Sequence, residues 1–332
     1  MNETFRALLV EQLEKKVFTR KIVARKVDDL PAGELLVRVH YSSLNYKDAL
    51  SATGNPGVTR NFPHTPGIDA AGEVVQCSAA GFAPGDQVIV TSYDLGMETD
   101  GGFGQMIRVP STWALKLPQG MTLKESMMLG TAGLTAALSV EELASNGVTP
   151  ARGPILVTGA TGGVGSLAVA ILAKAGYQVT AATGKLSETD YLKKLGAAEV
   201  IERTAVTAGV ERPMMKPRWA GVIDCVGGQT LAAAIKSTNP WGVVTCCGLV
   251  DTPDLPINVF PFILRGVRLI GIDSAECPRA PRVKVWQKLA HDWKPAQLET
   301  MVDEVGLEGL EEKIQAMLAG GLKRRVLVNL AL

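Results

Sequence analysis

The chain has 332 residues, enough for about two domains at roughly 150 residues each. It is 46% hydrophobic and 20% charged, with 34 basic and 33 acidic residues, which is ordinary for a globular enzyme and favours neither nucleic acid nor an anionic membrane as a partner. No run of about 18 apolar residues predicts a membrane span. The five irregularly spaced cysteines and the absence of a signal-peptide pattern predict a reducing, cytoplasmic location.

Residues 1–128 are predicted to form a β-rich domain. Short alternating or apolar runs in this part of the chain are separated by Gly, Pro and Asp turns, which is the pattern of a small barrel or sandwich. The runs are RALLVEQ (6–12), ELLVRVHY (34–41), AAGEVVQC (70–77), DQVIVTSY (86–93) and GQMIRVP (104–110).

From about residue 130, strand-like and helix-like segments alternate. Because such alternation is typical of βαβ units, we predict an α/β, doubly wound parallel sheet of the Rossmann type over residues 129–274. Segment 204–218 is expected to be an irregular connection, and residues 275–332 are expected to complete the β-rich domain. The strand-like runs are PILVTG (154–159), YQVTAAT (177–183), AEVIER (198–203), AGVIDCVG (220–227), GVVTCCG (242–248), VRLIGIDS (267–274) and RRVLVNL (324–330).

The stretch VTGATGGVG (157–165) marks a turn from strand to helix, because apolar residues recur at helical spacing from Val164 onward. Gly159, Gly162 and Gly163 leave backbone N–H groups open to a pyrophosphate, and the helix N-terminus adds partial positive charge. The pattern G-x-x-G-G-x-G departs from the usual G-x-G-x-x-G, so a tight turn without a ligand is the alternative. The surrounding βαβ unit favours dinucleotide binding.

Thr183, Gly184 and Lys185 end the second strand of this unit. An NAD site usually has Asp or Glu here, about 20 residues beyond the glycines, to bind the ribose hydroxyls. Lys185 would instead attract a 2′-phosphate, and Arg203, at the end of the third strand, is a second cation for the same group. The alternative is that both are solvated surface charges. We predict NADPH as the cofactor.

The order of these features resembles the medium-chain dehydrogenase/reductase superfamily over nearly the whole chain. A β-rich first half containing FPHTPGIDAAGEV (62–74) and FAPGDQVIV (82–90) precedes TGATGGVG (158–165), which opens the Rossmann unit. The resemblance implies a chaperonin-10-like barrel domain followed by a dinucleotide-binding Rossmann domain.

Many members of that superfamily hold zinc, and this sequence lacks the expected ligands. A catalytic zinc needs three protein ligands and a structural zinc needs four. The zinc enzymes have Gly-His-Glu where this chain has Gly67-Ile68-Asp69, and SSLNYKDAL (42–50) lacks their cysteine. His64, beside a proline in a turn, is expected to be hydrogen-bonded rather than a ligand. We expect no bound metal.

Several further stretches look like the zinc-free branch that contains acrylyl-CoA reductase and proteins catalogued as quinone oxidoreductases. The resemblance implies NADPH-dependent reduction of the C=C bond of a short 2-enoyl-CoA, with acrylyl-CoA to propionyl-CoA as the first choice. Hydride would add at the β-carbon and a proton at the α-carbon, without a metal. The stretches are LNYKDAL (44–50), FPHTPGIDAAGEV (62–74), WAGVIDCVGG (219–228), NVFPFILRGVRLIGIDS (258–274) and the closing RRVLVNL (324–330).

Tyr46 is the first candidate for a catalytic side chain. The resemblance puts it close to where the zinc ligand would be, so its hydroxyl could hydrogen-bond the thioester oxygen or pass a proton through water. Asn45 could orient the substrate or the nicotinamide. The alternative for Tyr46 is a barrel tyrosine that packs its ring. Asp48 is expected to be structural and Lys47 to be solvated.

By the same resemblance, further residues are expected to contact the cofactor, each with a packing or capping role as the alternative. Arg324 and Arg325 are candidates either for the phosphates of coenzyme A or for a solvated strand end. Cys246 and Cys247 are expected to be inert packing thiols in a buried strand. The further cofactor contacts are Thr161, Gly162, Gly163 and Val164 at the pyrophosphate, Leu249, Ile263 and Ser274 beside the nicotinamide, and Asn329 near the end of the chain.

Two other functions stay open at this point. An NADPH:quinone reductase would use the same cofactor site with a flatter substrate pocket, and a non-catalytic NADPH-binding protein would keep the cofactor alone. A zinc alcohol dehydrogenase is the least favoured class. The resemblance also implies a homodimer, with the edge strand near RLIGIDS (268–274) as the candidate contact.

Overall fold

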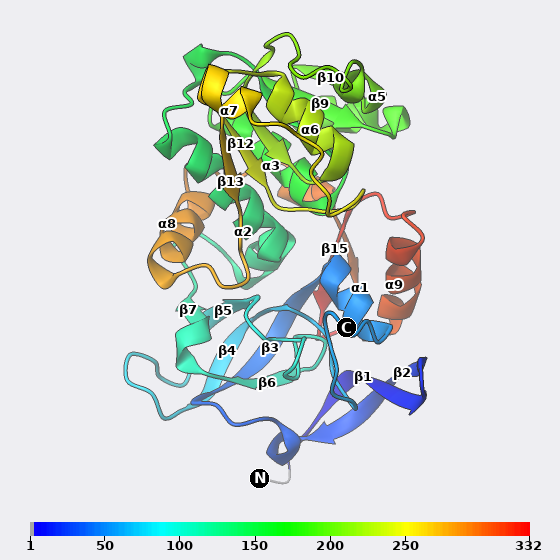
Figure 1. Ribbon diagram of the computed structural model, residues 1–332. Coiled ribbons are helices and arrows are strands. Elements are labelled where there is room, and N and C mark those ends of the chain that lie inside the picture. The colour runs from blue at the N-terminus through cyan, green and yellow to red at the C-terminus, as the bar shows by residue number, and fades with distance from the viewer. Residues whose placement is uncertain (1–2) are drawn as a thin grey trace. The chain divides into compact units, whose positions relative to one another are not determined.

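The computed structural model describes residues 3–332. The chain divides into a β-rich unit, Met1–Thr131 with Leu298–Leu332, and a parallel-sheet unit, Ala132–Gln297 (Figure 1). The structure thus has its boundaries at residues 131 and 297, where the sequence predicts 128 and 274. No helix among residues 3–332 is long and apolar enough to cross a membrane.

The β-rich unit is built on a sheet of order β14-β15-β3-β4-β5-β7, with β6 also paired to β3, and on a separate β1-β2 hairpin. Alternate residues of its strands point into one apolar core, as the period-2 patterns require. Its strands are β1 (Thr4–Glu14), β2 (Val17–Lys26), β3 (Leu35–Leu44), β4 (Asp69–Cys77), β5 (Gln87–Thr91), β6 (Met106–Val109), β7 (Ala114–Lys116), β14 (Val302–Val305) and β15 (Arg325–Asn329), and its helices include α1 (Tyr46–Ala52) and α9 (Leu310–Leu318).

The last strand of the chain belongs to this first unit. β15 pairs antiparallel with β3, with Val326 opposite Leu44 and Asn329 opposite Tyr41. The C-terminal segment therefore completes the sheet that the N-terminal segment begins.

The parallel-sheet unit has the strand order β10-β9-β8-β11-β12-β13. Counted from β8, this is the order 3-2-1-4-5-6 of a Rossmann fold, which confirms the predicted fold class. Its strands are β8 (Ile155–Val157), β9 (Val179–Thr183), β10 (Glu199–Glu202), β11 (Trp219–Asp224), β12 (Thr238–Cys246) and β13 (Arg268–Gly271), and its helices are α3 (Gly163–Lys174), α4 (Thr189–Lys194), α5 (Thr204–Thr207), α6 (Gly228–Lys236), α7 (Phe260–Arg265) and α8 (Arg279–Ala290).

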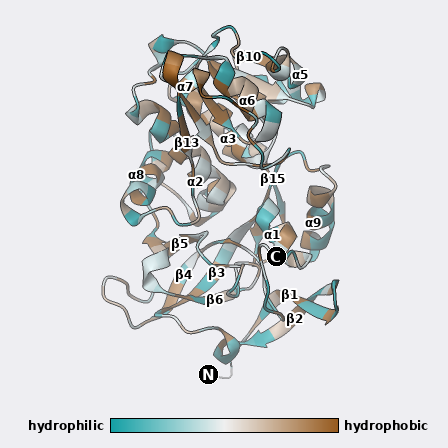
Figure 2. Ribbon diagram, in the orientation of Figure 1, coloured by the Kyte–Doolittle hydropathy of each residue, from teal (hydrophilic) through white to brown (hydrophobic). Residues whose placement is uncertain are grey.

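The central strands of this sheet are apolar throughout because helices cover both faces of such a sheet. All residues of β8 and β9 are buried, and Figure 2 shows apolar residues, in brown, near β13 and α7. Between β10 and β11 the chain forms only the single turn α5 before an irregular stretch, as the sequence predicts for 204–218.

Residues 275–297 stay with the parallel-sheet unit because α8 is held there by charge. Glu141, on α2 (Leu123–Ser145), accepts ion pairs from Lys284 at 2.5 Å and Lys288 at 2.6 Å. The buried Arg282 donates to the carbonyl oxygens of Ser274 and Ala275, both at 3.0 Å. These contacts fix α8 against the end of β13 and against α2.

Candidate functional sites

The glycine turn, Thr158–Gly162, lies at the point where the order of the parallel sheet reverses. It follows β8, whose two neighbours, β9 and β11, continue into opposite halves of the sheet. Ligands of doubly wound sheets bind outside the carboxyl ends of the strands at this point. The fold therefore puts the predicted dinucleotide motif where such a motif acts.

The backbone of the turn suits an anion. Gly159 has φ +60°, and a Cβ on Gly165 would overlap the Gly159 carbonyl oxygen, so α3 packs closely against the turn only without a side chain there. Gly162 is the N-cap of α3 and makes no side-chain capping hydrogen bond. The first N–H groups of this 12-residue helix thus carry partial positive charge at the end of the turn, which is a favourable place for an anion.

The ends of β9 and β10 lie beside each other, and both carry a cation. The Arg203 N–H donates to the Thr183 carbonyl at 2.9 Å, and the Lys185 N–H donates to Thr183 Oγ1 at 3.0 Å. A Cβ on Gly184 would stand 3.2 Å from Arg203 Cδ, so the arginine side chain lies over the glycine. Thr161 Oγ1, 3.3 Å from Thr183 Oγ1, links the glycine turn to this corner.

Asp224 is a site residue that the sequence analysis did not single out. It is buried at the carboxyl end of β11, where it accepts hydrogen bonds from Thr158 Oγ1 at 2.6 Å and from the Gly227 N–H at 2.8 Å. Burial raises the pKa of its carboxyl. Thr158 Oγ1 in turn accepts from the Cys225 N–H at 3.1 Å. Asp224 thus fixes the glycine turn to β11. In the sequence, its position as the single acid at the end of an apolar strand could have indicated this role.

Three other predicted cofactor contacts lie at different places in this unit. Leu249 follows β12 at the carboxyl edge of the sheet, near Gly227, and is 67% exposed. Ser274 follows β13, and its Oγ accepts from Thr135 Oγ1 at 2.8 Å. Ile263, 69% exposed, lies on α7. Arg265 ties α7 to the Thr238 carbonyl at 3.3 Å, near the amino end of β12.

Asn329 lies in the β-rich unit rather than in the parallel-sheet unit. It is in β15, where its Nδ2 donates to Glu304 Oε1 at 2.7 Å and its Oδ1 accepts from the Ala331 N–H at 3.0 Å. Both ends of the amide are occupied within the same sheet, so capping the strand end accounts for its contacts.

The second candidate site begins where β3 passes into α1. Asn45 is the N-cap of α1; its N–H donates to Asp48 Oδ2 at 2.7 Å in a capping box. Asp48 is buried, and its Oδ1 accepts from the Ile68 N–H at 2.8 Å. Tyr46 is the first residue of the helix and is 59% exposed. The cap is thus structural, as predicted for Asp48, while the tyrosine side chain projects into solvent.

A buried carboxylate holds the Asn45 amide in one orientation. Asp69 Oδ2 accepts from Asn45 Nδ2 at 2.8 Å and from Ser43 Oγ at 2.6 Å, and its Oδ1 accepts from Thr131 Oγ1 at 2.6 Å. The Arg325 guanidinium donates to Ser43 Oγ at 3.0 Å. We call these residues the Asp69 network. Arg325 is buried, so neither a coenzyme A contact nor a solvated strand end describes it.

Asp48 and Asp69 are both fully buried, and this raises the pKa of Asp48 to about 7. Burial is the main cause, and the negative charge of Asp69 adds to it. The hydrogen bonds from Asn45 and Ile68 oppose the shift without cancelling it. One carboxyl of the pair therefore exchanges a proton near neutral pH.

The backbone around the Asp69 network is strained. Ser92 and Tyr93 are consecutive residues with φ +66° and +54°, a region that costs about 1–2 kcal/mol for such residues. Ser92 Oγ lies 2.9 Å from Thr131 Oγ1, and Gly130, with φ +53°, interrupts α2 one residue earlier. Strain of this kind gathers at functional sites, which supports a role for this region.

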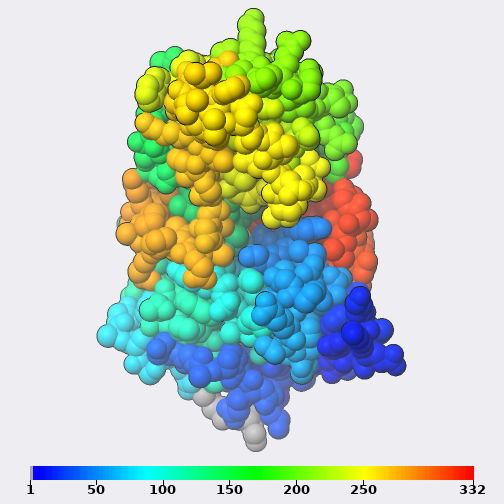
Figure 3. Space-filling view, in the orientation of Figure 1, coloured from blue at the N-terminus to red at the C-terminus, as the bar shows by residue number. Residues whose placement is uncertain are grey.

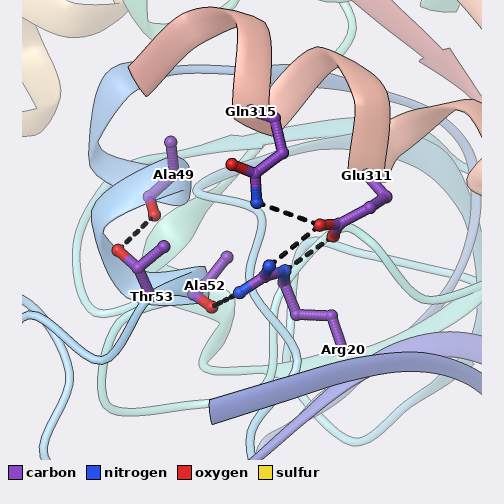
Figure 4. Close-up of polar contacts among 6 residues, drawn as sticks. All are labelled: Arg20, Ala49, Ala52, Thr53, Glu311 and Gln315. Atoms are coloured by element: carbon purple, nitrogen blue, oxygen red, sulfur yellow. Dashed lines mark hydrogen bonds and ion pairs between the residues drawn. The ribbon is translucent and has the colours of Figure 1, made fainter. Parts of the chain in front are cut away.

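The far end of α1 is clamped by an ion pair (Figure 4). Arg20 on β2 meets both carboxylate oxygens of Glu311 on α9, at 2.6 and 2.8 Å, and donates to the Ala52 carbonyl at 3.0 Å. This bidentate pair lowers the pKa of Glu311, and Gln315 Nε2 also donates to that carboxylate at 3.0 Å. Because α1 is fixed at both ends, Tyr46 stands on a rigid element.

Among residues 3–332, no three His, Cys, Asp or Glu side chains gather as a metal site. His64 is buried, and its Nε2 lies 2.9 Å from the Gly96 carbonyl oxygen, so it is the hydrogen-bonded loop residue that the sequence predicts. Burial lowers its pKa.

Two family models match the chain, an alcohol dehydrogenase GroES-like domain over residues 31–119 and a zinc-binding dehydrogenase over residues 163–291. With the Rossmann strand order and the glycine turn, they define the class: the chain belongs to the medium-chain dehydrogenase/reductase family of oxidoreductases. The predicted family is thereby confirmed.

Within this family, the chain is similar to two curated proteins over almost all of its length. One, from Bacillus subtilis, bears the name "Putative quinone oxidoreductase YhfP"; it is 45% identical, over 99% of this chain and 100% of its own. The other, acrylyl-CoA reductase AcuI from Ruegeria pomeroyi, is 41% identical over 98% and 99%. The branch predicted from sequence is the one that these relatives occupy.

Two solved structures of similar proteins have the same fold. The yhdH oxidoreductase of Salmonella enterica, crystallised with NADP, is 40% identical and superposes with a TM-score of 0.95 over 98% of this chain and 99% of its own. The Bacillus subtilis yhfP structure, with NAD bound, is 44% identical and superposes at 0.96 over 99% and 100%. Both relatives bind a nicotinamide dinucleotide on this fold.

Proposed function

We propose that this protein is an NADPH-dependent reductase of the C=C bond of a short 2-enoyl-CoA, with acrylyl-CoA to propionyl-CoA as the first choice. The observation that carries the proposal is the corner formed by the glycine turn, Gly184, Lys185 and Arg203, where the end of β9 carries Thr183, Gly184 and Lys185 in the place at which NAD sites usually have an acid. The similarity to AcuI supports the substrate class.

The residues of the parallel-sheet unit hold the cofactor in this proposal. The N–H groups at the start of α3, behind Thr161, Gly162, Gly163 and Val164, bind the pyrophosphate, and Thr183 supports Lys185 at the phosphate corner. When bound, NADPH supplies a hydride to the β-carbon of the substrate. Leu249, Ile263 and Ser274 remain the proposed nicotinamide contacts. Asn329, which also caps the end of β15, remains the proposed contact near the end of the chain.

Tyr46 acts on the substrate in this proposal. Its phenol hydroxyl donates a hydrogen bond to the thioester oxygen, where negative charge gathers as the β-carbon is reduced. The proton that ends on the α-carbon comes from this hydroxyl or through a water bound to it. Asn45, whose amide is held by Asp69, is a positioning residue for the start of α1.

The two similar structures differ in cofactor: the Bacillus subtilis relative was crystallised with NAD and the Salmonella enterica relative with NADP. The side chains of this chain decide for NADPH. An acid at the end of β9 would repel the 2′-phosphate, and Thr183, Gly184 and Lys185 occupy that place.

The direct test compares substrates and cofactors in one assay. The loss of reduced-nicotinamide absorbance is followed with acrylyl-CoA, crotonyl-CoA and a benzoquinone, each with NADPH and with NADH. We expect the highest kcat/KM for acrylyl-CoA with NADPH. A clear preference for the benzoquinone would replace the proposal with a quinone reductase, and no turnover with NADPH bound would replace it with a binding protein.

Tyr46→Phe tests the catalytic role separately from the fold. Because the side chain is exposed, we expect the melting temperature to stay the same, while kcat falls about 10²-fold, the usual contribution of one positioned donor. A rate within about twofold of the unchanged protein would remove the hydroxyl from the mechanism.

A quinone reductase is the second candidate, and the name of the 45% identical relative favours it. It shares the cofactor corner with the first proposal, so only the substrate panel separates the two. The five cysteines are free thiols in the structure, in keeping with the cytoplasmic location that we propose for either enzyme.

We also propose a homodimer formed through β13. This strand is at the edge of the parallel sheet, and apolar side chains beside it are exposed, among them Trp241 and Leu264. Figure 3 shows the segment around residues 250–265, in yellow, at the surface. Sedimentation should give a dimer, and Leu264→Lys should shift it toward the monomer; a monomeric unchanged protein would contradict the assignment.

A further inference from the structure

Two cysteines face each other beside the glycine turn. Cys225 follows β11 and Cys247 follows β12, one residue beyond the register pair of Asp224 and Cys246. Their sulfur atoms are 3.8 Å apart, and the Cys247 N–H donates to the Asp224 carbonyl at 3.0 Å. Both side chains are half-buried. The reaction proposed above uses neither thiol.

The other three cysteines are not part of this pair. Cys246 precedes Cys247 in β12, and because successive side chains of a strand point to opposite faces, it packs instead against the apolar cluster around Val222 and Val244. Cys77 lies in β4 of the β-rich unit, where its Sγ donates to the Ala79 carbonyl at 3.0 Å. Cys277 is buried beside α8.

We propose that Cys225 and Cys247 form a redox-sensitive dithiol that a peroxide converts to a disulfide, and that this disulfide weakens cofactor binding. The disulfide site stands on the geometry of the two sulfurs alone. Its effect on the cofactor rests on the proposed function.

The two thiols come from adjacent strand ends, one residue beyond the Asp224–Cys246 register pair, and their sulfurs are 3.8 Å apart. The sulfurs must approach by roughly 1.8 Å to reach a bond length of about 2.05 Å. Rotation about χ1 at the two residues, together with a shift of the two backbone segments toward each other, supplies this movement.

The chemistry balances with hydrogen peroxide or an alkyl hydroperoxide as the oxidant. The Cys247 thiolate attacks the peroxide O–O bond, which gives a sulfenic acid and hydroxide, or an alkoxide. Cys225 then attacks the sulfenic sulfur; the S–O bond breaks, the S–S bond forms, and water leaves with the thiol proton. Two thiols lose two electrons and the peroxide gains them.

The two thiols have different roles in this sequence. The hydrogen bond shared with Cys247, together with burial, holds the pKa of the Cys225 thiol well above its ordinary value. A thiol of this kind is a poor first nucleophile, so Cys247 reacts first and Cys225 resolves the sulfenic acid.

The pair is built into the walls of the predicted cofactor site. A Cβ on Gly159 would lie 3.4 Å from Cys225 Cβ, and Gly248 packs directly against the Cys225 backbone. Thr158 Oγ1 accepts from the Cys225 N–H. Closing the disulfide draws Cys225 and Cys247 together and therefore shifts both the glycine turn and the segment that leads to Leu249.

The first measurement maps the disulfide without reference to activity. The protein is treated with hydrogen peroxide, digested without reduction and analysed by mass spectrometry. We expect a peptide pair linked through Cys225 and Cys247, which Cys225→Ser and Cys247→Ser each abolish and Cys246→Ser retains. Absence of this linkage, or over-oxidation of Cys247 without it, overturns the proposal.

The second measurement titrates NADPH into the reduced and oxidised proteins by fluorescence. We expect the Kd to rise about tenfold on oxidation and to return with dithiothreitol, and bound NADPH to slow disulfide formation, because the coupling is reciprocal. An unchanged Kd with the disulfide present overturns the regulatory role. If the linkage forms in a protein that does not bind NADPH, the dithiol site stands and the cofactor proposal fails.

Discussion

The two units build their candidate sites in opposite ways. In the β-rich unit, the buried Asp69 accepts hydrogen bonds from several donors, among them Asn45, the N-cap residue of the helix on which the exposed Tyr46 lies. In the parallel-sheet unit, the candidate site depends on the absence of side chains, because glycines at 159, 162 and 165 follow the end of a strand. The first site is sensitive to charge and the second to volume.

Gly130→Ala has the largest expected effect on stability, because it adds volume directly beside the buried charge of Asp69. The new Cβ would stand 2.5 Å from Asp69 Oδ2 and from Ser43 Oγ, at a residue with φ +53°. We expect a loss of at least about 3 kcal/mol in the free energy of unfolding, measured by urea denaturation.

Gly147→Ala is the matched control for this change. It has φ +83° and open space around the Cβ position, so only the backbone strain of about 1 kcal/mol applies. Equal losses of unfolding free energy for the two variants would show that the Asp69 network tolerates the added Cβ. The proposed difference between the two units would then be wrong.

Asp48→Asn tests the charge sensitivity through pH. The pKa of Asp48 is about 7 in the folded protein and 3.8 when unperturbed, so between these values only the folded state holds the proton. The stability from this group is complete below about pH 4 and is lost as the pH rises toward 7, by about 2 kcal/mol between pH 5 and pH 7.

The difference in unfolding free energy between the unchanged protein and Asp48→Asn should move by that amount. The variant should gain relative stability at pH 7 compared with pH 5, as measured by urea denaturation at both values. A difference that is the same at the two pH values would mean that Asp48 is ionised throughout.

Gly165→Ala tests the volume sensitivity of the glycine turn. Alanine is favoured in a helix by about 1 kcal/mol, yet here its Cβ overlaps the Gly159 carbonyl. We expect a net loss of about 1–2 kcal/mol and a weaker NADPH affinity, followed by thermal melts and fluorescence titration. Gly162→Ala, whose Cβ would stand 3.2 Å from the same oxygen, should cost less; the reverse order would contradict the packing argument.

The Lys185→Ala, Arg203→Ala double variant has the smallest expected effect, because both side chains are exposed and the proposed loss is confined to the 2′-phosphate. The KM for NADPH should rise about tenfold, or about 1.4 kcal/mol, while the KM for NADH changes little. Lys216→Ala, an exposed cation of the same unit, is the control. Equal losses for both cofactors would remove the phosphate assignment.

Local patterns were enough to predict the parallel-sheet unit. Each of its six strands overlaps a strand-like run of the sequence, and β8, at the centre of the sheet, is continuously apolar and buried. The glycine turn could also be predicted, because its proposed function depends on glycines, and these are identified directly in the sequence.

The Asp69 network could not be predicted in the same way. Its members come from four separate parts of the sequence, and no local pattern around them predicts burial; they are Ser43 and Asn45, Asp69, Thr131 and Arg325. Arg325 at a strand end looked solvated, although the fold buries it. The Cys225–Cys247 contact was missed for the same reason: strand register, rather than composition, brings the two thiols together.

The pairing of β15 with β3 also has a consequence for synthesis on the ribosome. Residues 132–297 contain every strand of the parallel sheet, so this unit can fold as soon as it has emerged. The β-rich unit starts first but needs Arg325 and the strand that carries it, so its buried Asp69 waits for nearly the whole chain. The unit that is translated first is therefore the last to be completed.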